Sequence, residues 1–236
     1  MKHVSNPRNF LFDLYGTLVD IHTDEESAAF WNAVAALFEL GDAQTIRARY
    51  LALCHAEKLP EGGEFDLLKV FERLDEEFGG KREPEAIARA FRAASMKKLR
   101  LFHGAKEILR GLRERGAGVY LLSNAQACFT RYELEQLGIL ELFDGIILSS
   151  EVGWKKPCAK FFEAALEMFS LSPASCVYIG NDLHDDIAGS HSVHMRNVYL
   201  PTEQSGKYAE NIVPDLAVKD HGELEKVLFE MTGEIV

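Results

Sequence analysis

Four short clusters of polar residues carry side chains that could do chemistry, and each follows a stretch typical of the end of a β-strand. They supply a carboxylate, a hydroxyl and amide pair, an ammonium group and a second group of acids, in that order. Together such groups could bind and transform a dianion. The clusters are residues 13–17, 123–124, 155–157 and 180–186.

Hydrolysis of a phosphate ester is one reaction that this set of side chains could catalyse. A carboxylate such as that of Asp13 can attack phosphorus and form an aspartyl-phosphate, which water cleaves in a second step. Because the carboxylate and the phosphate repel each other, the reaction needs a divalent cation, a lysine and hydrogen-bond donors. The candidate ligands are hard oxygens, which predicts Mg²⁺. They are Asp13, a backbone carbonyl, and Asn181, Asp182 or Asp186.

The elements that must position these clusters alternate between strands and helices. Short apolar runs alternate with longer helical patterns after residue 104, which predicts βαβ units and a parallel sheet covered on both faces. The carboxyl ends of parallel strands lie on one edge of a sheet, so the four clusters should converge there. We expect strands at residues 10–12, 118–122, 145–148, 175–179 and 197–200, and helices at 105–115, 128–136, 159–169 and 223–231.

The chain between the first strand and residue 101 has a different pattern. Leu67, Phe71 and Leu74 recur at helical spacing, and we expect helices and no strand in this part, with residues 97–100 as a solvated helix end. The predicted fold class is therefore α/β, a doubly wound parallel sheet with an inserted all-helical domain. The expected core comprises residues 1–21 and 102–236, and the expected insertion comprises residues 22–101.

The composition excludes several classes of function. The 236 residues include 26 Lys and Arg against 37 Asp and Glu, a net charge of −11, whereas nucleic-acid binding depends on clustered basic residues. No apolar run approaches the roughly 20 residues that span a bilayer, and no signal-peptide pattern is expected. The four cysteines form no Cys-x-x-Cys pair, which favours reduced thiols and a cytoplasmic location. We expect no nucleic-acid or membrane partner, and the oligomeric state stays open.

Four segments, in this order, resemble the motifs of the haloacid dehalogenase-like (HAD) hydrolase superfamily: FDLYGTLVD, LLSNA, KKP and IGNDLHDDI. The resemblance covers essentially the whole chain and places the helical insertion where that family carries its cap. It implies a Rossmann-like core and, for the family's phosphatases, bound Mg²⁺ and a small phosphorylated substrate. It also implies residue roles: Asp13 as nucleophile, Thr17 as a loop-stabilising hydroxyl, Ser123 and Asn124 as phosphate contacts, Lys156 as the third-motif lysine, and Asp186 as the distal acid of the fourth motif.

The first motif departs from the phosphatase pattern at Tyr15. Phosphatases of the family usually carry a second Asp there, which protonates the leaving oxygen and then activates water. The family's metal-independent 2-haloacid dehalogenases carry Asp-x-Tyr-Gly-Thr instead, and in that reaction Asp13 would displace halide, which needs no proton. The backbone carbonyl of Tyr15 could still bind a metal ion.

The fourth motif points towards a metal-dependent phosphatase. Dehalogenases have a neutral Ser-Ser-Asn-type motif, whereas this chain has several acids, and clustered acids beside an anion require a cation. Either Asn181 or Asp182 could be the proximal ligand, and either Lys155 or Lys156 could enter the site. A Mg²⁺-dependent phosphatase is the leading hypothesis. The alternatives are a metal-independent 2-haloacid dehalogenase and an inactive binding or regulatory protein with the same fold.

The substrate would be held by groups from both parts of the chain. The first two clusters should supply the phosphate contacts, which are Tyr15, Gly16, Thr17, Ser123 and Asn124. In the insertion, Arg47 and Arg49 are the best candidates to clamp a carboxylate or phosphate, because a guanidinium group binds such groups bidentately. Closure of the insertion over the site would exclude water. The identity of the substrate is not determined by the sequence.

Overall fold

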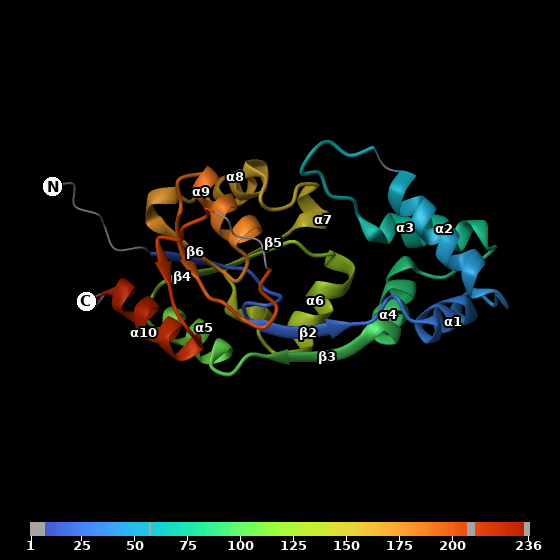
Figure 1. Ribbon diagram of the computed structural model, residues 1–236, viewed down its shortest axis with the longest axis horizontal. Helices are drawn as coiled ribbons and strands as arrows, with labels where there is room; N and C mark the ends of the chain where they lie inside the picture. The colour runs from blue at the N-terminus through green and yellow to red at the C-terminus, as the bar shows by residue number, and fades with distance from the viewer. Residues whose placement is uncertain (1–7, 57, 207–210, 234–236) are drawn as a thin grey trace.

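A six-stranded parallel sheet forms the centre of the fold (Figure 1), and its middle strand is the first apolar run of the chain. The computed structural model describes residues 8–56, 58–206 and 211–233. Strand β1 (Asn9–Phe12) lies between β4 (Gly118–Ser123) and β6 (Cys176–Gly180). The outer strands are β5 (Gly145–Leu148), β7 (Arg196–Tyr199) and β8 (Leu216–Ala217). This order confirms the predicted doubly wound sheet.

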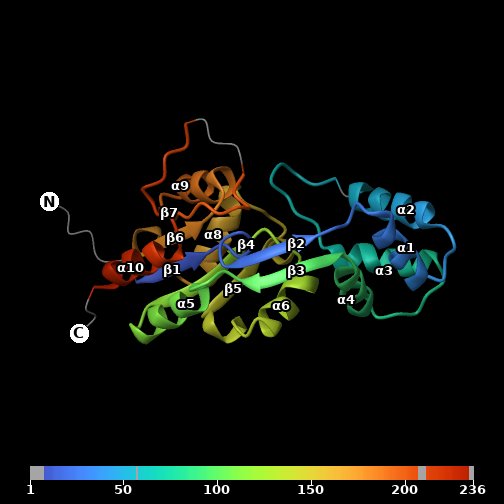
Figure 2. The ribbon, with the colours of Figure 1, turned by 60° about the horizontal axis from the view of Figure 1, so that its bottom comes forward.

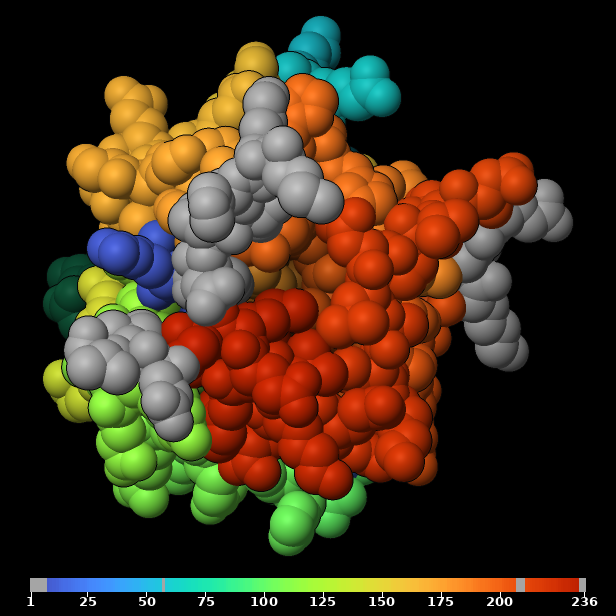
Figure 3. Space-filling model, turned by 90° about the vertical axis from the view of Figure 1, so that its left-hand side faces the viewer, coloured from blue at the N-terminus to red at the C-terminus, as the bar shows by residue number. Residues whose placement is uncertain are grey.

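Both faces of the sheet are covered by helices because successive residues of a strand point to opposite faces. Phe10 and Phe12 pack on the side of α5 (Ala105–Glu114) and α10 (His221–Thr232), whereas Leu11 packs on the side of α8 (Ala159–Met168). All three strand residues are fully buried, as expected for a strand in the middle of a parallel sheet. Figure 3 shows α10 across the end of the core that faces away from the helical insertion.

Four further helical elements follow strands β4, β5 and β6. Helix α6 (Ala127–Gln136) follows β4, and the short α7 (Ser149–Val152) follows β5. After β6 the chain forms a π-helix, η3 (Leu183–Ala188), which continues into α9 (Gly189–Ser192). The expected elements of the core are confirmed to within one or two residues, but α7 and the π-helical form of η3 were not predicted.

Four helices between residues 28 and 95, called here the helical segment, form a separate apolar cluster at one end of the molecule (Figure 2). They are α1 (Ala28–Leu37), α2 (Ala43–Ala56), α3 (Leu67–Glu77) and α4 (Pro84–Ser95). Phe30, Phe71 and Phe91 are buried in this cluster, and Phe129 of α6 packs against it. The segment therefore has its own core and also contacts the sheet domain.

An antiparallel ribbon connects the helical segment to the sheet, and this ribbon corrects the expectation of no strand there. It consists of β2 (Val19–Thr23) and β3 (Met96–Leu101). Lys98 and Arg100, expected at a helix end, lie on one side of β3 and both pair with Asp20 of β2. Local spacing could not reveal this strand, because its partner lies about 80 residues away in the sequence. Strand β2 also crosses the expected domain boundary at residue 21.

Within the described ranges, no helix combines the length and the apolar character needed to cross a membrane.

Candidate active site

Asp13 directly follows the central strand, and its loop returns over the carboxyl edge of the sheet. The Thr17 hydroxyl lies 2.9 Å from Asp13 Oδ2 and 3.1 Å from Asn181 Oδ1, so it connects the first and fourth clusters. Gly16 has a φ of +88°, and a Cβ there would lie 2.5 Å from Asn181 Nδ2. Glycine is therefore needed both for the left-handed turn and for the close approach of Asn181.

Lys156 occupies the floor of the site, where it joins two acids from different strands. Its side chain is 3% exposed, and its Nζ lies 2.7 Å from Asp13 Oδ1 and 2.6 Å from Asp186 Oδ1. The hydroxyl of Tyr178, in the middle of β6, is the third partner at 2.9 Å. The tertiary structure thus resolves the choice between the neighbouring lysines, because Lys155 is exposed at the surface.

Asn124 holds the backbone of Lys156 in place. Its Oδ1 accepts from the Lys156 N–H at 2.7 Å, and its Nδ2 donates to the Lys156 carbonyl at 3.0 Å and to Asp185 at 3.1 Å. Both amide hydrogens are occupied, so the side chain positions the lysine and has no donor left for a phosphate. Ser123, at the end of β4, is buried and lines the pocket.

The loop after β6 separates the roles of two adjacent residues. The side chain of Asn181 faces Thr17 and Thr202, whereas Asp182 Oδ1 accepts from the N–H groups of His184 and Asp185 at 2.8 Å and caps η3. Asp186 is 1% exposed, and its Oδ2 accepts from the Asp182 N–H at 2.9 Å. Asn181 is thus the residue that the fold turns towards Asp13.

The hydroxyl of Tyr15 points away from Asp13 towards α6. It donates to Glu133 and lies 3.0 Å from the Thr130 hydroxyl. Glu133 is 2% exposed and pairs at 2.6 Å with Arg92 of α4. Burial, followed by the charge of Glu133, raises the pKa of Tyr15 far above its usual value. Tyr15 therefore remains neutral, and its hydroxyl is not a proton donor for a substrate beside Asp13.

Burial and neighbouring charges shift the pKa values on the floor of the site. Burial raises the pKa of Asp186 to about 6, and the opposing charge of Lys156 limits the rise. For Lys156, burial favours the neutral amine, but the carboxylates of Asp13 and Asp186 outweigh it and hold the pKa well above its usual value. The ammonium is therefore charged at neutral pH and partly offsets the charge of the two acids.

These groups surround a pocket of about 170 Å³ at the carboxyl edge of the sheet. Its size suits a phosphoryl group with a small remainder. Most of the predicted site residues meet here, although they come from four separate loops. The lining residues are Asp13, Tyr15, Ser123, Asn124, Lys156, Asn181, Asp182, Asp185, Asp186 and Gln204.

The donor set fits a hard divalent cation that keeps much of its water. Asp13 and Asp186 both present carboxylates to the pocket, and the amide oxygen of Asn181 is linked to Asp13 through the Thr17 hydroxyl, at 3.1 and 2.9 Å. Mg²⁺ is commonly bound by one or two carboxylates with waters and substrate oxygens in the remaining positions. No set of three or more His, Cys, Asp or Glu side chains within the described ranges could hold a metal ion by itself.

Arg47 and Arg49 do not reach this pocket, which corrects the expectation that they clamp the substrate. Both lie on α2, where Arg47 pairs with Glu26 at 3.0 Å and Arg49 pairs with Glu77. All four side chains are more than one-third exposed. The helical pattern placed these arginines on α2 but did not show which face of α2 they occupy.

Three contributors were missed or misread in the sequence. Tyr178 lies inside a buried strand, where its hydroxyl was hidden in an apolar run. Gln204 comes from a loop with no motif. Asp185 was not among the predicted site residues but lines the pocket. A polar group in a fully buried strand was the available signal for Tyr178, since such a group needs a partner.

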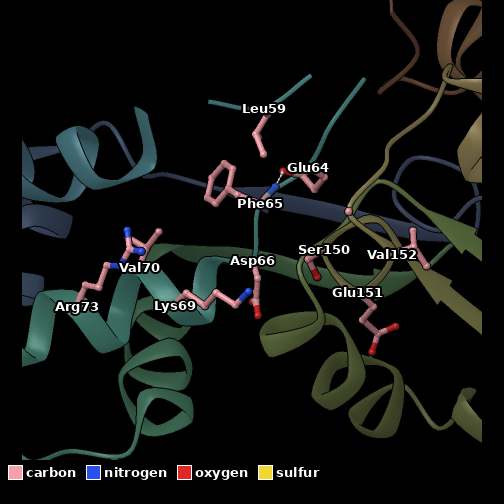
Figure 4. A pocket seen from close by; sticks show the side chains of 11 residues that line it. Leu59, Glu64, Phe65, Asp66, Lys69, Val70, Arg73, Ser150, Glu151 and Val152 are labelled. Carbon is pink, nitrogen blue, oxygen red and sulfur yellow. Dashed lines mark hydrogen bonds between the residues drawn. The ribbon is translucent and has the colours of Figure 1, made fainter. Parts of the chain in front are cut away.

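The loop before α3 is bound to the core loop that leads to Lys156. The Glu64 N–H donates to the Gly153 carbonyl at 3.0 Å, and the Lys155 N–H donates to the Gly62 carbonyl at 2.9 Å. A second pocket, of about 280 Å³, lies beside this contact between α3 and α7 (Figure 4). This pocket shares no lining residue with the pocket of Asp13.

The side chain of Gln126 makes a second connection between the two parts. It follows the Ser123–Asn124 cluster and reaches the start of α3, where it accepts from the Leu67 N–H at 2.8 Å and donates to the Phe65 carbonyl at 3.0 Å. The helical segment is therefore held to the core by the β2–β3 ribbon on one side and by these loop contacts on another.

Known proteins are similar in sequence to this chain. The chain is 29% identical to the glyceraldehyde 3-phosphate phosphatase of Pyrococcus furiosus over 90% of this chain and 85% of that protein. It is 31% identical to the ribulose-1,5-bisphosphate 5-phosphatase of Halopiger xanaduensis, but that match spans about half (51%) of each protein.

Solved structures share the fold. A HAD phosphatase from Thermococcus onnurineus has a TM-score of 0.61 at 21% identity, covering 94% of this chain and 97% of that chain. A 2-haloacid dehalogenase from Pseudomonas syringae pv. Tomato DC3000 has a TM-score of 0.67 at 17% identity, covering 95% and 99%. The model of the haloacid dehalogenase-like hydrolase family matches residues 7–193, which include all four clusters. The chain therefore belongs to the haloacid dehalogenase-like hydrolase family.

Proposed function

We propose that this protein is a Mg²⁺-dependent phosphohydrolase that acts on a small phosphorylated metabolite through an aspartyl-phosphate. The position of Asp13 carries the proposal, because its two oxygens lie against the Lys156 ammonium and the Thr17 hydroxyl. The pocket around it is rich in acids, which favours a metal-dependent site. The relatives named as phosphatases support the same reaction.

Four groups would hold the ion: Asp13, the Tyr15 carbonyl, Asn181 and Asp186. Asp182 is a weaker candidate because it already caps η3. When bound, Mg²⁺ would offset the negative charge of the phosphoryl oxygens as the carboxylate approaches.

The chain's own residues account for the bond changes. An oxygen of Asp13 forms a bond to phosphorus while the ester P–O bond breaks and its electron pair leaves with the substrate oxygen. Lys156 balances the charge beside Asp13, and Ser123 contributes a hydroxyl donor. In the second step, a water oxygen bonds to phosphorus and the bond to Asp13 breaks, which restores the carboxylate; one proton of the water stays on the phosphate and the other balances the proton taken up by the leaving oxygen.

The proton for the leaving oxygen comes from a group other than Tyr15, whose hydroxyl donates to Glu133. A leaving group of low pKa needs no such proton. We therefore expect an aryl phosphate to be hydrolysed faster than an alkyl phosphate. The ratio of these two rates should be larger in this protein than in a relative that has Asp at the position of Tyr15.

The helical segment would act as the cap over this pocket. It is attached to the core by the ribbon and the Gln126 contact, and its closure over the pocket, which none of its residues lines here, would exclude bulk water.

A second candidate is a 2-haloacid dehalogenase, which Tyr15 favours because its position matches that family's first motif. The acid-rich lining of the pocket argues against it, since a haloacid brings a carboxylate and no metal. An inactive protein that only binds its ligand is the third candidate.

Phosphate release from p-nitrophenyl phosphate tests the proposal. Turnover that is stopped by EDTA, restored by Mg²⁺ and abolished in Asp13→Asn would support it. Asp42→Asn is the matched control, because Asp42 is exposed and asparagine also caps a helix. Chloride release from 2-chloropropionate in the presence of EDTA would instead support the dehalogenase. Neither activity, with retained phosphate binding, would support the third candidate.

The protein would work in the cytoplasm. All four cysteines are free, which is the state expected in a reducing compartment.

A further inference from the structure

A chain of polar contacts runs from the helical segment to the loop of Asp13. It begins at Arg92 in the last turn of α4, passes through Glu133 of α6 and ends at the hydroxyl of Tyr15, two residues after Asp13. Figures 1 and 2 show α4 beside α6. The bond changes proposed above use none of these three side chains, although Glu133 is buried and the other two are half-buried.

Glu133 uses its two oxygens for two different parts of the molecule. Its Oε1 accepts from Arg92 Nε at 2.6 Å, and its Oε2 accepts from the hydroxyl of Tyr15. The carboxylate is 3% exposed, and hydrogen bonds to a charged group are stronger where water does not compete for them. A displacement of Arg92 would therefore act on the same carboxylate that holds Tyr15.

Arg92 lies where the chain passes between the helical segment and the β2–β3 ribbon. Helix α4 ends three residues later at Ser95, whose carbonyl accepts from the Asp24 N–H at 2.8 Å, so both passages of the chain are close to Arg92. The guanidinium also lies 5.0 Å from the ring centre of Phe129 in the core. A change in the angle between the segment and the ribbon would therefore change the contact of Arg92 with Glu133.

At the other end, Tyr15 belongs to the turn that carries Asp13. Tyr15 forms a β-bridge with Val19, and the Gly16 N–H donates to the Val19 carbonyl at 2.9 Å. The tyrosine side chain is rigid, with only two torsion angles, so a fixed hydroxyl restricts the backbone that bears it. The hydrogen bond to Glu133 therefore holds one side of the turn in place.

Resting on the proposed phosphohydrolase function, we propose that Glu133 is a positioning residue that makes the alignment of Asp13 depend on the position of the helical segment. With Arg92 in contact, the carboxylate is fixed where it accepts from Tyr15. When the segment moves and withdraws Arg92, a buried carboxylate without its cation is costly, so Glu133 turns towards water or takes up a proton. Either change weakens the bond from Tyr15 and loosens the turn.

The alternative is an ion pair that only stabilises the contact between α4 and α6. The two possibilities differ in what they predict for catalysis. In the first, Arg92 acts on Asp13 only through the hydroxyl of Tyr15. In the second, the loss of Arg92 has the same effect with or without that hydroxyl.

A double-mutant cycle on kcat separates these possibilities. Tyr15→Phe removes the hydroxyl and keeps the ring, and Arg92→Met removes the cation and keeps much of the side-chain length. With p-nitrophenyl phosphate and saturating Mg²⁺, each change alone should lower kcat about tenfold and change KM less than about twofold, because a misaligned carboxylate slows attack and not binding. Once Tyr15→Phe is present, Arg92→Met should lower kcat further by less than about twofold.

Hydrogen exchange without metal or substrate measures the same coupling independently of catalysis. Arg92→Met should speed exchange at the amides of Gly16, Thr17 and Leu18, which bond within the turn, by at least about fivefold. The amides of α10, at the end of the core that faces away from the helical segment, should be unchanged. In the Tyr15→Phe protein the turn should exchange fast whether or not Arg92→Met is added.

Two exposed residues on the same helices supply matched controls. Arg89→Met removes an arginine one turn earlier on α4, and Glu135→Gln removes an acid two residues after Glu133 on α6. Neither change should alter kcat or the exchange of the turn.

Each outcome decides for or against the coupling. Independent, multiplicative losses of kcat in the cycle, or exchange that accelerates in α10 as much as in the turn, would overturn the inference and leave an ion pair that only stabilises the fold. Unchanged kcat and exchange in Tyr15→Phe would overturn it as well, and this variant suffices if Arg92→Met does not fold. If no phosphate is released even by the unmodified protein, the proposed function is wrong, and hydrogen exchange alone then decides the coupling.

Discussion

Replacement of the buried Lys156 by methionine should destabilise the protein as well as inactivate it. Methionine has a similar length but no charge, so the change removes the cation between Asp13 and Asp186 and leaves the surrounding packing nearly intact. Both carboxylates are less than 10% exposed and would lose a partner at 2.7 and 2.6 Å. Two like charges would then face each other in a site with little water.

The structure sets the size of the loss in the free energy of unfolding. Removal of one partner from a buried charge pair costs about 3–5 kcal/mol, because the other charge stays buried and unpaired. Asp186 limits this cost, since its pKa is already about 6 and would rise further without Lys156, so that it takes up a proton. We therefore expect the free energy of unfolding to fall by about 3 kcal/mol at pH 7 in the absence of metal.

Urea denaturation of Lys156→Met with EDTA measures this loss. Lys155→Met is the matched control, because the adjacent lysine is exposed and its replacement should cost less than about 0.5 kcal/mol. Mg²⁺ should stabilise Lys156→Met more than the unmodified protein, since it can take the place of the missing charge. A folded Lys156→Met that loses less than about 1 kcal/mol, or no more than Lys155→Met, would refute the reasoning.

Three further outcomes follow from the same geometry. In metal-free protein the raised pKa of Asp186 contributes stability below about pH 4, and this contribution is lost as the pH rises through about 6. The free energy of unfolding of the unmodified protein should therefore fall by about 2–3 kcal/mol between these pH values, as measured by urea titrations. In Asp186→Asn this dependence on pH should be absent. Gly16→Ala should destabilise the protein by about 1–3 kcal/mol and lower turnover, because its Cβ would displace Asn181. Gly79 also has a positive φ but lies in open space, so Gly79→Ala should lower the stability and leave turnover unchanged. Gln126→Ala should speed hydrogen exchange at the start of α3 about thirtyfold, since two hydrogen bonds of about 1 kcal/mol each hold it, and unchanged exchange there would contradict this role.

The α/β class and the convergence of the four clusters could be predicted from the sequence. Phe10, Leu11 and Phe12 form an apolar run with Asp13 at its end, and such a run is buried on both faces wherever it pairs in a parallel sheet. Parallel strands place their carboxyl ends on one edge, so the meeting of Asp13 and Lys156 required no knowledge of individual contacts. Local pattern and topology were sufficient for these features.

The tertiary structure alone decided which side chains meet at the pocket. The sequence showed Tyr15 but not that its hydroxyl would turn to Glu133, and it showed Arg47 but not that Glu26 would bind it. Strand β3 depended on β2, far away along the chain. Periodicity determines the face of an element on which a residue lies, whereas the partner of a side chain depends on long-range packing. At the pocket, that packing places Lys156 together with four aspartates.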